Sequence, residues 1–210
     1  DEFMAAEVHP NLERFEQKDW DPLRQTVRKC ADLGLLGADV PESLGGVDLD
    51  KVSSLLISER FGPSASFATT FAVQVNLATL PILMFGTDEQ KRAYIPRLVS
   101  GEIIGAYALS ESGAGSDALG IKARAARQPD GGFVLSGEKM WISNGGFADM
   151  IIVFAKVDGE HFTAFIVERA FPGVAIGKEE HKLGLHGSST TSILLQDVPV
   201  PAANLLGEEN

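Results

Sequence analysis

The residues best suited to chemistry lie in a segment of small side chains at positions 107–117. The segment reads Tyr-Ala-Leu-Ser-Glu-Ser-Gly-Ala-Gly-Ser-Asp, so a strand-like stretch runs into a loop with two glycines and three serines. Glycine lets a backbone approach a ligand closely, and successive N–H and hydroxyl groups can form a concave site for an anion. A pyrophosphate or the electron-rich edge of a flavin would fit such a loop, although composition alone equally allows a simple glycine-rich turn.

A second segment, at positions 137–146, places a tryptophan among polar and small residues. It reads Gly-Glu-Lys-Met-Trp-Ile-Ser-Asn-Gly-Gly. This segment by itself leaves two interpretations open. Trp141 is a buried core residue before a hairpin, or it forms an aromatic wall against a planar ligand to which Ser143 hydrogen-bonds.

Residues 113–118 also match a dinucleotide-binding pattern. Gly-Ala-Gly-Ser-Asp-Ala has the form G-x-G-x-x-A after a strand. That pattern binds a dinucleotide where a helix follows it and a parallel strand lies within about 30 residues. Here Gly120 and a Pro-Asp-Gly-Gly turn at 129–132 leave little room for a crossover helix. We therefore do not expect a nicotinamide-binding Rossmann domain.

The first hundred residues carry the signals of several helices. The segment 22–33 has a proline in its first turn, a glycine after its end and apolar residues at helical spacing. Asp48 is expected to cap the next helix, and Thr87 with Gln90 has the pattern of a capping box for a helix that runs through Leu98. Between these two helices lies the apolar stretch 65–85, which polar residues and a proline interrupt. We expect it to be a buried helix at the centre of a bundle and not a membrane span.

After residue 102 the pattern changes to short strand candidates separated by turns. Strands are expected over 103–109, 133–135, 150–157, 163–167, 174–176 and 193–195, with Pro-Asp-Gly-Gly, Asp-Gly and Phe-Pro-Gly turns between them. No long helical pattern lies between these stretches, which favours antiparallel pairing. The sequence therefore predicts an α+β protein in which an all-α helical domain, residues 1–101, precedes an antiparallel β-sandwich or barrel domain, residues 102–210.

Composition narrows the classes of function. Of the 210 residues, 44% are hydrophobic and 22% are charged, as in ordinary globular proteins. The net charge is −11, and nucleic-acid binders carry a basic stripe instead, so no nucleic-acid partner is expected. The short basic cluster Lys122, Arg124 and Arg127 is expected to be a solvated face that could attract an anionic ligand.

Cysteine and histidine content argues against disulfides and metal sites. With Cys30 as the only cysteine, no disulfide can form within the chain, and the four histidines lack metal-ligand spacing. No metal site is expected. No signal peptide is visible, and the chain starts at Asp1 without an initiator methionine, so we expect both ends to be cut from a longer protein.

Taken together, the two segments resemble the acyl-CoA dehydrogenases. That family carries a Tyr-x-Leu/Val-Thr-Glu-Pro-x-Ala-Gly-Ser-Asp loop and, after a short insert, a Gly-x-Lys-x-Trp-Ile-Thr/Ser-Asn segment, which appear here at 107–117 and 137–144. Segments 40–46, 85–91, 162–168 and 198–201 also resemble the family in the same order. The resemblance thus covers nearly the whole chain, and the stretch 141–156 is most similar to the very-long-chain branch.

The resemblance implies FAD-dependent oxidation of an acyl-CoA thioester to the trans-2-enoyl-CoA, as in fatty acid β-oxidation. In that reaction a carboxylate removes an α-proton while the β-hydride passes to flavin N5. The family also implies an electron-transfer flavoprotein as acceptor, a homodimer or homotetramer, and a place in the bacterial cytoplasm or the mitochondrial matrix. The alternatives are an acyl-CoA oxidase, a related flavin monooxygenase or an inactive scaffold.

The same resemblance assigns site residues. Nine residues would bind the cofactor: Tyr107, Leu109, Ser110, Glu111, Gly115, Ser116, Trp141, Ile142 and Ser143. Positions 109–111 would line the pyrimidine edge of the flavin, and 115–116 would meet the pyrophosphate, with Ser116 also a candidate for binding the substrate. Trp141 would pack on the flavin, and Ser143 would hydrogen-bond near N5.

Two kinds of departure from the family pattern matter. Ser110 replaces the usual threonine and Ser112 the usual proline, and the second change should loosen the free loop because a fixed φ is lost. No acidic residue here corresponds to the catalytic base, since Glu111 and Asp117 look like carboxylates that shape the loop. The family takes its base from a C-terminal helical domain absent from this sequence, so we expect the chain alone to be inactive.

Overall fold

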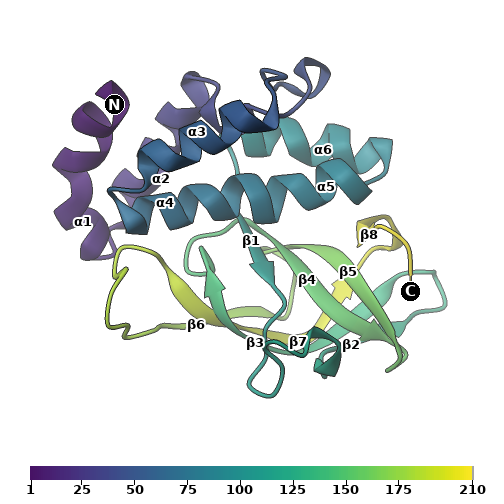
Figure 1. Ribbon diagram of the computed structural model, residues 1–210. Coiled ribbons are helices and arrows are strands. Elements are labelled where there is room, and N and C mark those ends of the chain that lie inside the picture. The colour runs from purple at the N-terminus through teal and green to yellow at the C-terminus, as the bar shows by residue number, and fades with distance from the viewer. Residues whose placement is uncertain (210) are drawn as a thin grey trace.

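The computed structural model describes residues 1–209 and shows a layer of helices stacked on a β-sheet (Figure 1). The helices come first: α1 (Leu12–Glu16), α2 (Trp20–Asp32), α3 (Lys51–Phe61), α4 (Ala65–Ala72), α5 (Leu80–Phe85) and α6 (Asp88–Val99). The strands follow: β1 (Gly105–Ala108), β2 (Arg124–Arg127), β3 (Phe133–Ser143), β4 (Met150–Val157), β5 (His161–Glu168), β6 (Val174–Glu179), β7 (Thr190–Val200) and β8 (Leu205–Leu206). The predicted α+β class, with helices before a mostly antiparallel sheet, is confirmed.

The long apolar segment 65–85 is a core helix. α4, the π-helical stretch η5 (Val73–Thr79) and α5 follow one another without a break and lie over the sheet (Figure 1). Among the described residues this is the one helix long and apolar enough to cross a membrane, and half of its most apolar window is buried inside the protein. Gln74 fixes its place, because this buried side chain donates to the carbonyls of Leu98 and Ile103 and accepts from the N–H of Gly105.

The predicted N-terminal cap is confirmed for α6 and wrong for α3. Thr87 Oγ1 accepts from the N–H of Gln90 at 3.2 Å and Gln90 Oε1 accepts from the N–H of Thr87 at 3.0 Å, so the predicted capping box of α6 is confirmed. The prediction that Asp48 caps α3 is wrong, since Asp50 accepts from the N–H of Ser53 at 3.0 Å. Asp48 has a left-handed backbone with φ 58°, whereas an N-cap needs the extended backbone that Asp50 has.

The sheet has the strand order β6-β7-β3-β2-β4-β5-β8, with β1 paired to β4 beside this path. The β1–β4 and β2–β4 pairs are parallel, and the other pairs are antiparallel. Two strands separate β3 from β5 in this order, yet the rings of Phe133 and Phe165 lie 5.0 Å apart. The sheet therefore curls around a common core.

The side chains of β4 point alternately into two separate hydrophobic cores. Ile151 and Val153 point into the core that the curled sheet encloses, whereas Met150 and Ile152 pack with residues of the helices. Side chains of β4 alternate between the two faces because successive residues of a strand point in opposite directions. One face of the sheet is thus covered by helices, and the other face curls around its own core. β1 runs away from the helices, so the loop after it lies on the side of the molecule away from the helical layer (Figure 1).

Candidate functional site

The two segments singled out in the sequence are joined by hydrogen bonds. The N–H of Met140 donates to the carbonyl of Ser110 at 2.9 Å. The Nζ of Lys139 donates to the carbonyl of Leu109 at 3.0 Å. Consecutive residues of β3 therefore hold consecutive carbonyls of the loop after β1. We call residues 109–117 together with 139–143 the loop–bulge surface.

A β-bulge makes these residues of β3 available to the loop. The register between β3 and β7 shifts between Lys139 and Ile142, so Met140 and Trp141 have no partner on β7. Trp141 has φ 57°, a strained conformation for a bulky residue that is found mostly at functional sites. Its side chain is 57% exposed. The interpretation of Trp141 as a buried core residue is therefore wrong.

Glu111 anchors the loop. The residue is only 7% exposed. Its carboxylate accepts from the N–H groups of Lys122 at 2.6 Å and Ala123 at 3.0 Å, and from Nζ of Lys139 at 2.7 Å. Burial by itself would raise the pKa of this carboxyl, but the three donors outweigh burial and hold the pKa below its usual value. The side chain is thus an ionised structural group that holds the loop in place.

The outer part of the loop presents polar groups that have no partner. Within residues 1–209, Ser112, Gly113, Gly115 and Ser116 make no hydrogen bond, and all four are exposed. Neither glycine has a positive φ, and a Cβ built at either one meets nothing within 4 Å. The described chain gives no steric reason for two glycines here, whereas close approach of an anionic ligand would supply one.

The remaining predicted residues differ in what they can offer. Ser110 and Ser143 are partly exposed. The Ile142 side chain is 2% exposed and belongs to the core of the curled sheet, so only its backbone can reach a ligand. The Tyr107 ring packs 5.0 Å from that of Phe154 on the helix-facing side of the sheet. The structure thus brings together the loop, Trp141 and Ser143, and places the side chains of Tyr107 and Ile142 in packed surroundings.

Basic side chains lie next to the loop. Lys122, Arg124 and Lys156 line a small pocket of about 220 Å³. The pocket adjoins the loop because the N–H of Lys122 is one of the donors to Glu111. Arg124 is exposed on β2, as the prediction of a solvated basic face requires. These three cations give the neighbourhood a local positive charge in a chain whose net charge is −11.

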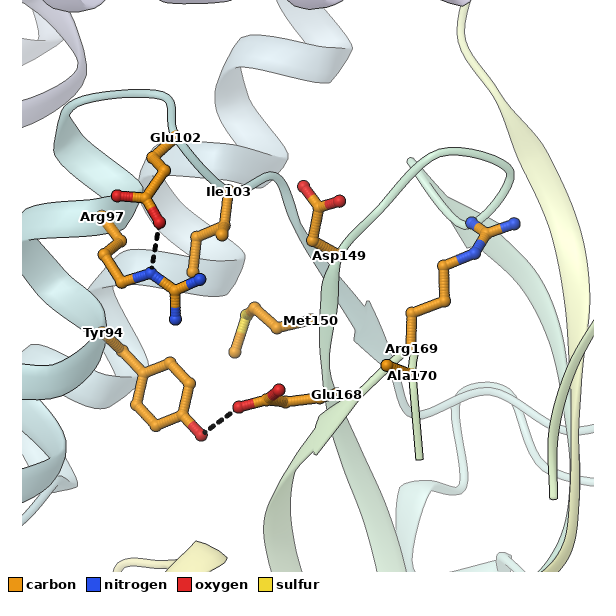
Figure 2. Close-up of a pocket in the computed structure, with 9 residues that line it drawn as sticks. All are labelled: Tyr94, Arg97, Glu102, Ile103, Asp149, Met150, Glu168, Arg169 and Ala170. Atoms are coloured by element: carbon orange, nitrogen blue, oxygen red, sulfur yellow. Dashed lines mark hydrogen bonds and ion pairs between the residues drawn. The ribbon is translucent and has the colours of Figure 1, made fainter. Parts of the chain in front are cut away.

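A separate pocket of about 580 Å³ lies between α6 and the β4–β5 pair (Figure 2). None of the nine predicted residues lines it. In Figure 2 four of its polar side chains form two pairs, with the hydroxyl of Tyr94 donating to Glu168 at 3.1 Å and Nε of Arg97 donating to Glu102 at 2.7 Å. Burial and the Glu168 carboxylate raise the pKa of the Tyr94 phenol. The Tyr94–Glu168 bond joins α6 to β5, which is a structural role, so we assign the site to the loop–bulge surface.

Two family models match the chain. The model described as "Acyl-CoA dehydrogenase, N-terminal domain" matches residues 1–102, and "Acyl-CoA dehydrogenase, middle domain" matches residues 106–198. A "Probable acyl-CoA dehydrogenase" of Bacillus subtilis is 49% identical over 99% of this chain and 35% of its own length. The human "Short-chain specific acyl-CoA dehydrogenase, mitochondrial" is 39% identical over 99% of this chain and 51% of its own length. The chain spans about a third to a half of the length of such relatives.

Solved structures also match this chain over nearly its whole length. The Bacillus anthracis acyl-CoA dehydrogenase complexed with FAD has a TM-score of 0.97 at 51% identity, covering 99% of this chain and 36% of that one. The butyryl-CoA dehydrogenase of Megasphaera elsdenii has a TM-score of 0.92 at 39% identity, covering 99% and 56%. A chain in the structure described as "Electron transferring flavoprotein of Acidaminococcus fermentans" has a TM-score of 0.92 at 36% identity, also covering 99% and 56%.

Proposed function

The chain belongs to the acyl-CoA dehydrogenase family, and on that basis we propose that it supplies the FAD- and acyl-CoA-binding surface of a flavin-dependent dehydrogenase. Residues 1–101 would be its helical domain and residues 102–210 its β domain. The observation that carries the proposal is the loop–bulge surface, where a strained and exposed Trp141 stands beside a loop of uncommitted donors. The FAD complex of the Bacillus anthracis relative supports the same cofactor.

The residues present fit this cofactor. The free N–H and hydroxyl groups of Ser112, Gly113, Gly115 and Ser116 can hydrogen-bond to a pyrophosphate. Trp141 offers an indole face for a planar ring, and Ser110 and Ser143 offer hydroxyls at its edge. When bound, the flavin would supply the hydride-accepting chemistry, while the protein orients it and polarises its edge.

The proposed substrate is an acyl-CoA thioester of fatty acid β-oxidation. Coenzyme A is a polyanion, and the basic pocket of Lys122, Arg124 and Lys156 beside the loop would attract its phosphates. Ser116, which is exposed and has no hydrogen-bond partner among the described residues, would contact the substrate as well as the cofactor. The very-long-chain likeness seen in the sequence remains a prediction.

The proposed catalytic base lies outside residues 1–210. Glu111 would not serve as the base, because its buried carboxylate already accepts three hydrogen bonds. Asp117 is exposed at the end of the loop, and its backbone carbonyl accepts from the N–H of Gly120 at 3.1 Å, so its proposed role is in the turn after the loop. The residues described here would therefore bind and orient, and the whole protein would carry out the proton abstraction.

Assembly and location are proposed from the family. An electron-transfer flavoprotein would accept the electrons, which the match to a chain in the Acidaminococcus fermentans structure supports. The whole protein would form a homodimer or homotetramer. Its relatives occur in Bacillus subtilis and in mitochondria, which supports the bacterial cytoplasm or the mitochondrial matrix as its place of action.

The proposal predicts a change of colour. The whole protein that carries this chain should absorb as a yellow flavoprotein after reconstitution with FAD, and a saturated acyl-CoA added without oxygen should bleach it. Failure to take up FAD would contradict the proposal. In air, release of peroxide with the same substrate would identify an acyl-CoA oxidase, and a flavoprotein that no acyl-CoA bleaches would favour the scaffold alternative.

A further inference from the structure

We propose that buried Lys139 is a positioning residue for the flavin, which sets the shape of the loop over residues 109–116 from the neighbouring strand. The inference rests on the proposed function, because this loop is the surface proposed to bind FAD. It goes further by assigning the shape of the loop to one side chain that does not itself form part of the exposed surface.

Lys139 is fully buried, and both of its acceptors belong to the loop. Its Nζ donates to the carbonyl of Leu109 at 3.0 Å and to Oε1 of Glu111 at 2.7 Å. A buried ammonium loses its hydration, so an apolar side chain of similar length would be the less costly occupant of this position if packing were its only task. The two hydrogen bonds are therefore the reason for a lysine here.

The two acceptors depend on Lys139 to different degrees. Glu111 keeps two backbone donors, the N–H groups of Lys122 and Ala123, when the ammonium is removed. The carbonyl of Leu109 has no second donor among the described residues. Loss of Lys139 would thus release the start of the loop while Glu111 stays attached by two of its three bonds.

The backbone contacts show why the start of the loop matters. Next to Leu109, Ser110 accepts from the N–H of Met140 at 2.9 Å, and Glu111 and Ala114 exchange two backbone hydrogen bonds of 3.0 and 3.1 Å. Residues 109–111 are thus held at three successive points, and the exposed donors beyond them project from this base. A ligand that meets such a preset loop loses less binding energy to ordering it.

A different explanation is that Lys139 only neutralises Glu111. The two explanations separate in the double variant Lys139→Met with Glu111→Gln, which removes both charges together. Neutralisation predicts that the double variant recovers both thermal stability and FAD affinity. Positioning predicts that FAD affinity stays reduced in the double variant whatever its thermal midpoint, because the Leu109 carbonyl still lacks its donor.

The test measures FAD dissociation constants and thermal midpoints in the whole protein for the single and double variants. Lys139→Met should weaken FAD binding at least about tenfold, since a charge-assisted hydrogen bond is lost. The matched control is Arg24→Met, which breaks the 2.8 Å ion pair with Asp149 away from the loop and should lower the midpoint without changing FAD affinity. Wild-type affinity in Lys139→Met, or in the double variant, would overturn the inference.

A second measurement needs no flavin, and so it separates this inference from the proposed function. In the flavin-free protein, Lys139→Met should speed hydrogen exchange at the amides of Glu111, Ala114 and Met140, and should leave the capping amide of Gln90 unchanged. Unchanged exchange in the loop would refute the positioning role whether or not the wild type binds FAD. If methionine prevents folding, Lys139→Gln takes its place, because glutamine is too short to reach both acceptors.

Discussion

At the scale of single residues, Trp141 is the most informative side chain. A left-handed backbone costs a bulky residue about 1–3 kcal/mol, and an indole that is 57% exposed gains little from packing in return. The bulge in β3 imposes this conformation and also turns the N–H of Met140 toward the loop. The strain is explained if the bulge presents the indole to a flat ligand.

Replacing Trp141 with glycine should separate folding from binding. Relief of the backbone strain offsets the extra chain entropy of glycine, so the free energy of unfolding should change by less than about 1 kcal/mol. FAD affinity should fall, because the aromatic contact is lost. Urea denaturation and FAD titration measure the two quantities.

Leu185 provides the matched control for this substitution. It also has a left-handed backbone, with φ 55°, and is 45% exposed, but it lies outside the loop–bulge surface. Leu185→Gly should keep both its stability and its FAD affinity. The account of Trp141 would fail if Trp141→Gly bound FAD as tightly as the wild type does.

The sequence predicted which residues meet at this surface better than it predicted what each one does. The spacing of Gly, Ser and Trp was enough to select the two segments. The roles of Glu111 and Lys139 depend on contacts across 11 to 30 residues of chain. The exposure of Trp141 depends on a register shift against β7, which no local pattern reveals.

At the scale of elements, α6 shows that a residue with a locally predictable role, Gln90, can also make a distant contact. Its capping box was predictable, since Thr87 and Gln90 are three residues apart. The same Gln90 side chain also donates from Nε2 to the carbonyls of Ala203 and Leu205, which tie the end of the chain to the helical layer. The long-range contact had no signal in the sequence, because a backbone carbonyl looks the same at every position.

These two roles of the cap predict unequal costs. Thr87→Ala loses one capping bond and should lower the free energy of unfolding by about 1 kcal/mol. Gln90→Ala also strands two carbonyls near the C-terminal end, so it should cost roughly 2–4 kcal/mol. Urea unfolding of both variants decides the point, and equal losses would show that the contacts to Ala203 and Leu205 contribute nothing.

Strand lengths were the least predictable property of the elements. The candidate strand at 133–135 extends to Ser143, past a Ser-Gly pair that normally signals a turn. Gly137 is needed there for a different reason, because it has φ 153° and a Cβ would lie 2.8 Å from the backbone of Ala123. The glycine thus allows a close approach between β3 and the chain before β2.

At the scale of the whole molecule, the helical layer braces the strand that leads into the site. Gln74 bonds to the N–H of Gly105 at the first residue of β1, and a Cβ at Gly105 would lie 2.2 Å from that of Ala78. The core helix and β1 are therefore in direct contact. The helical and strand-like patterns of the two halves predicted both layers. How closely the layers pack was not predictable, because a glutamine that will be buried looks like any other polar residue in the sequence.

The most direct test of the central claim, that FAD binds at the loop–bulge surface, is the FAD dissociation constant of two matched glycine variants of the whole protein. Gly115 and Gly184 are both exposed, neither has a positive φ, and a Cβ at either meets nothing within 4 Å. The free chain should therefore tolerate leucine at both positions. We predict that Gly115→Leu loses FAD binding while Gly184→Leu retains it, and equal FAD affinity in the two variants would contradict the account.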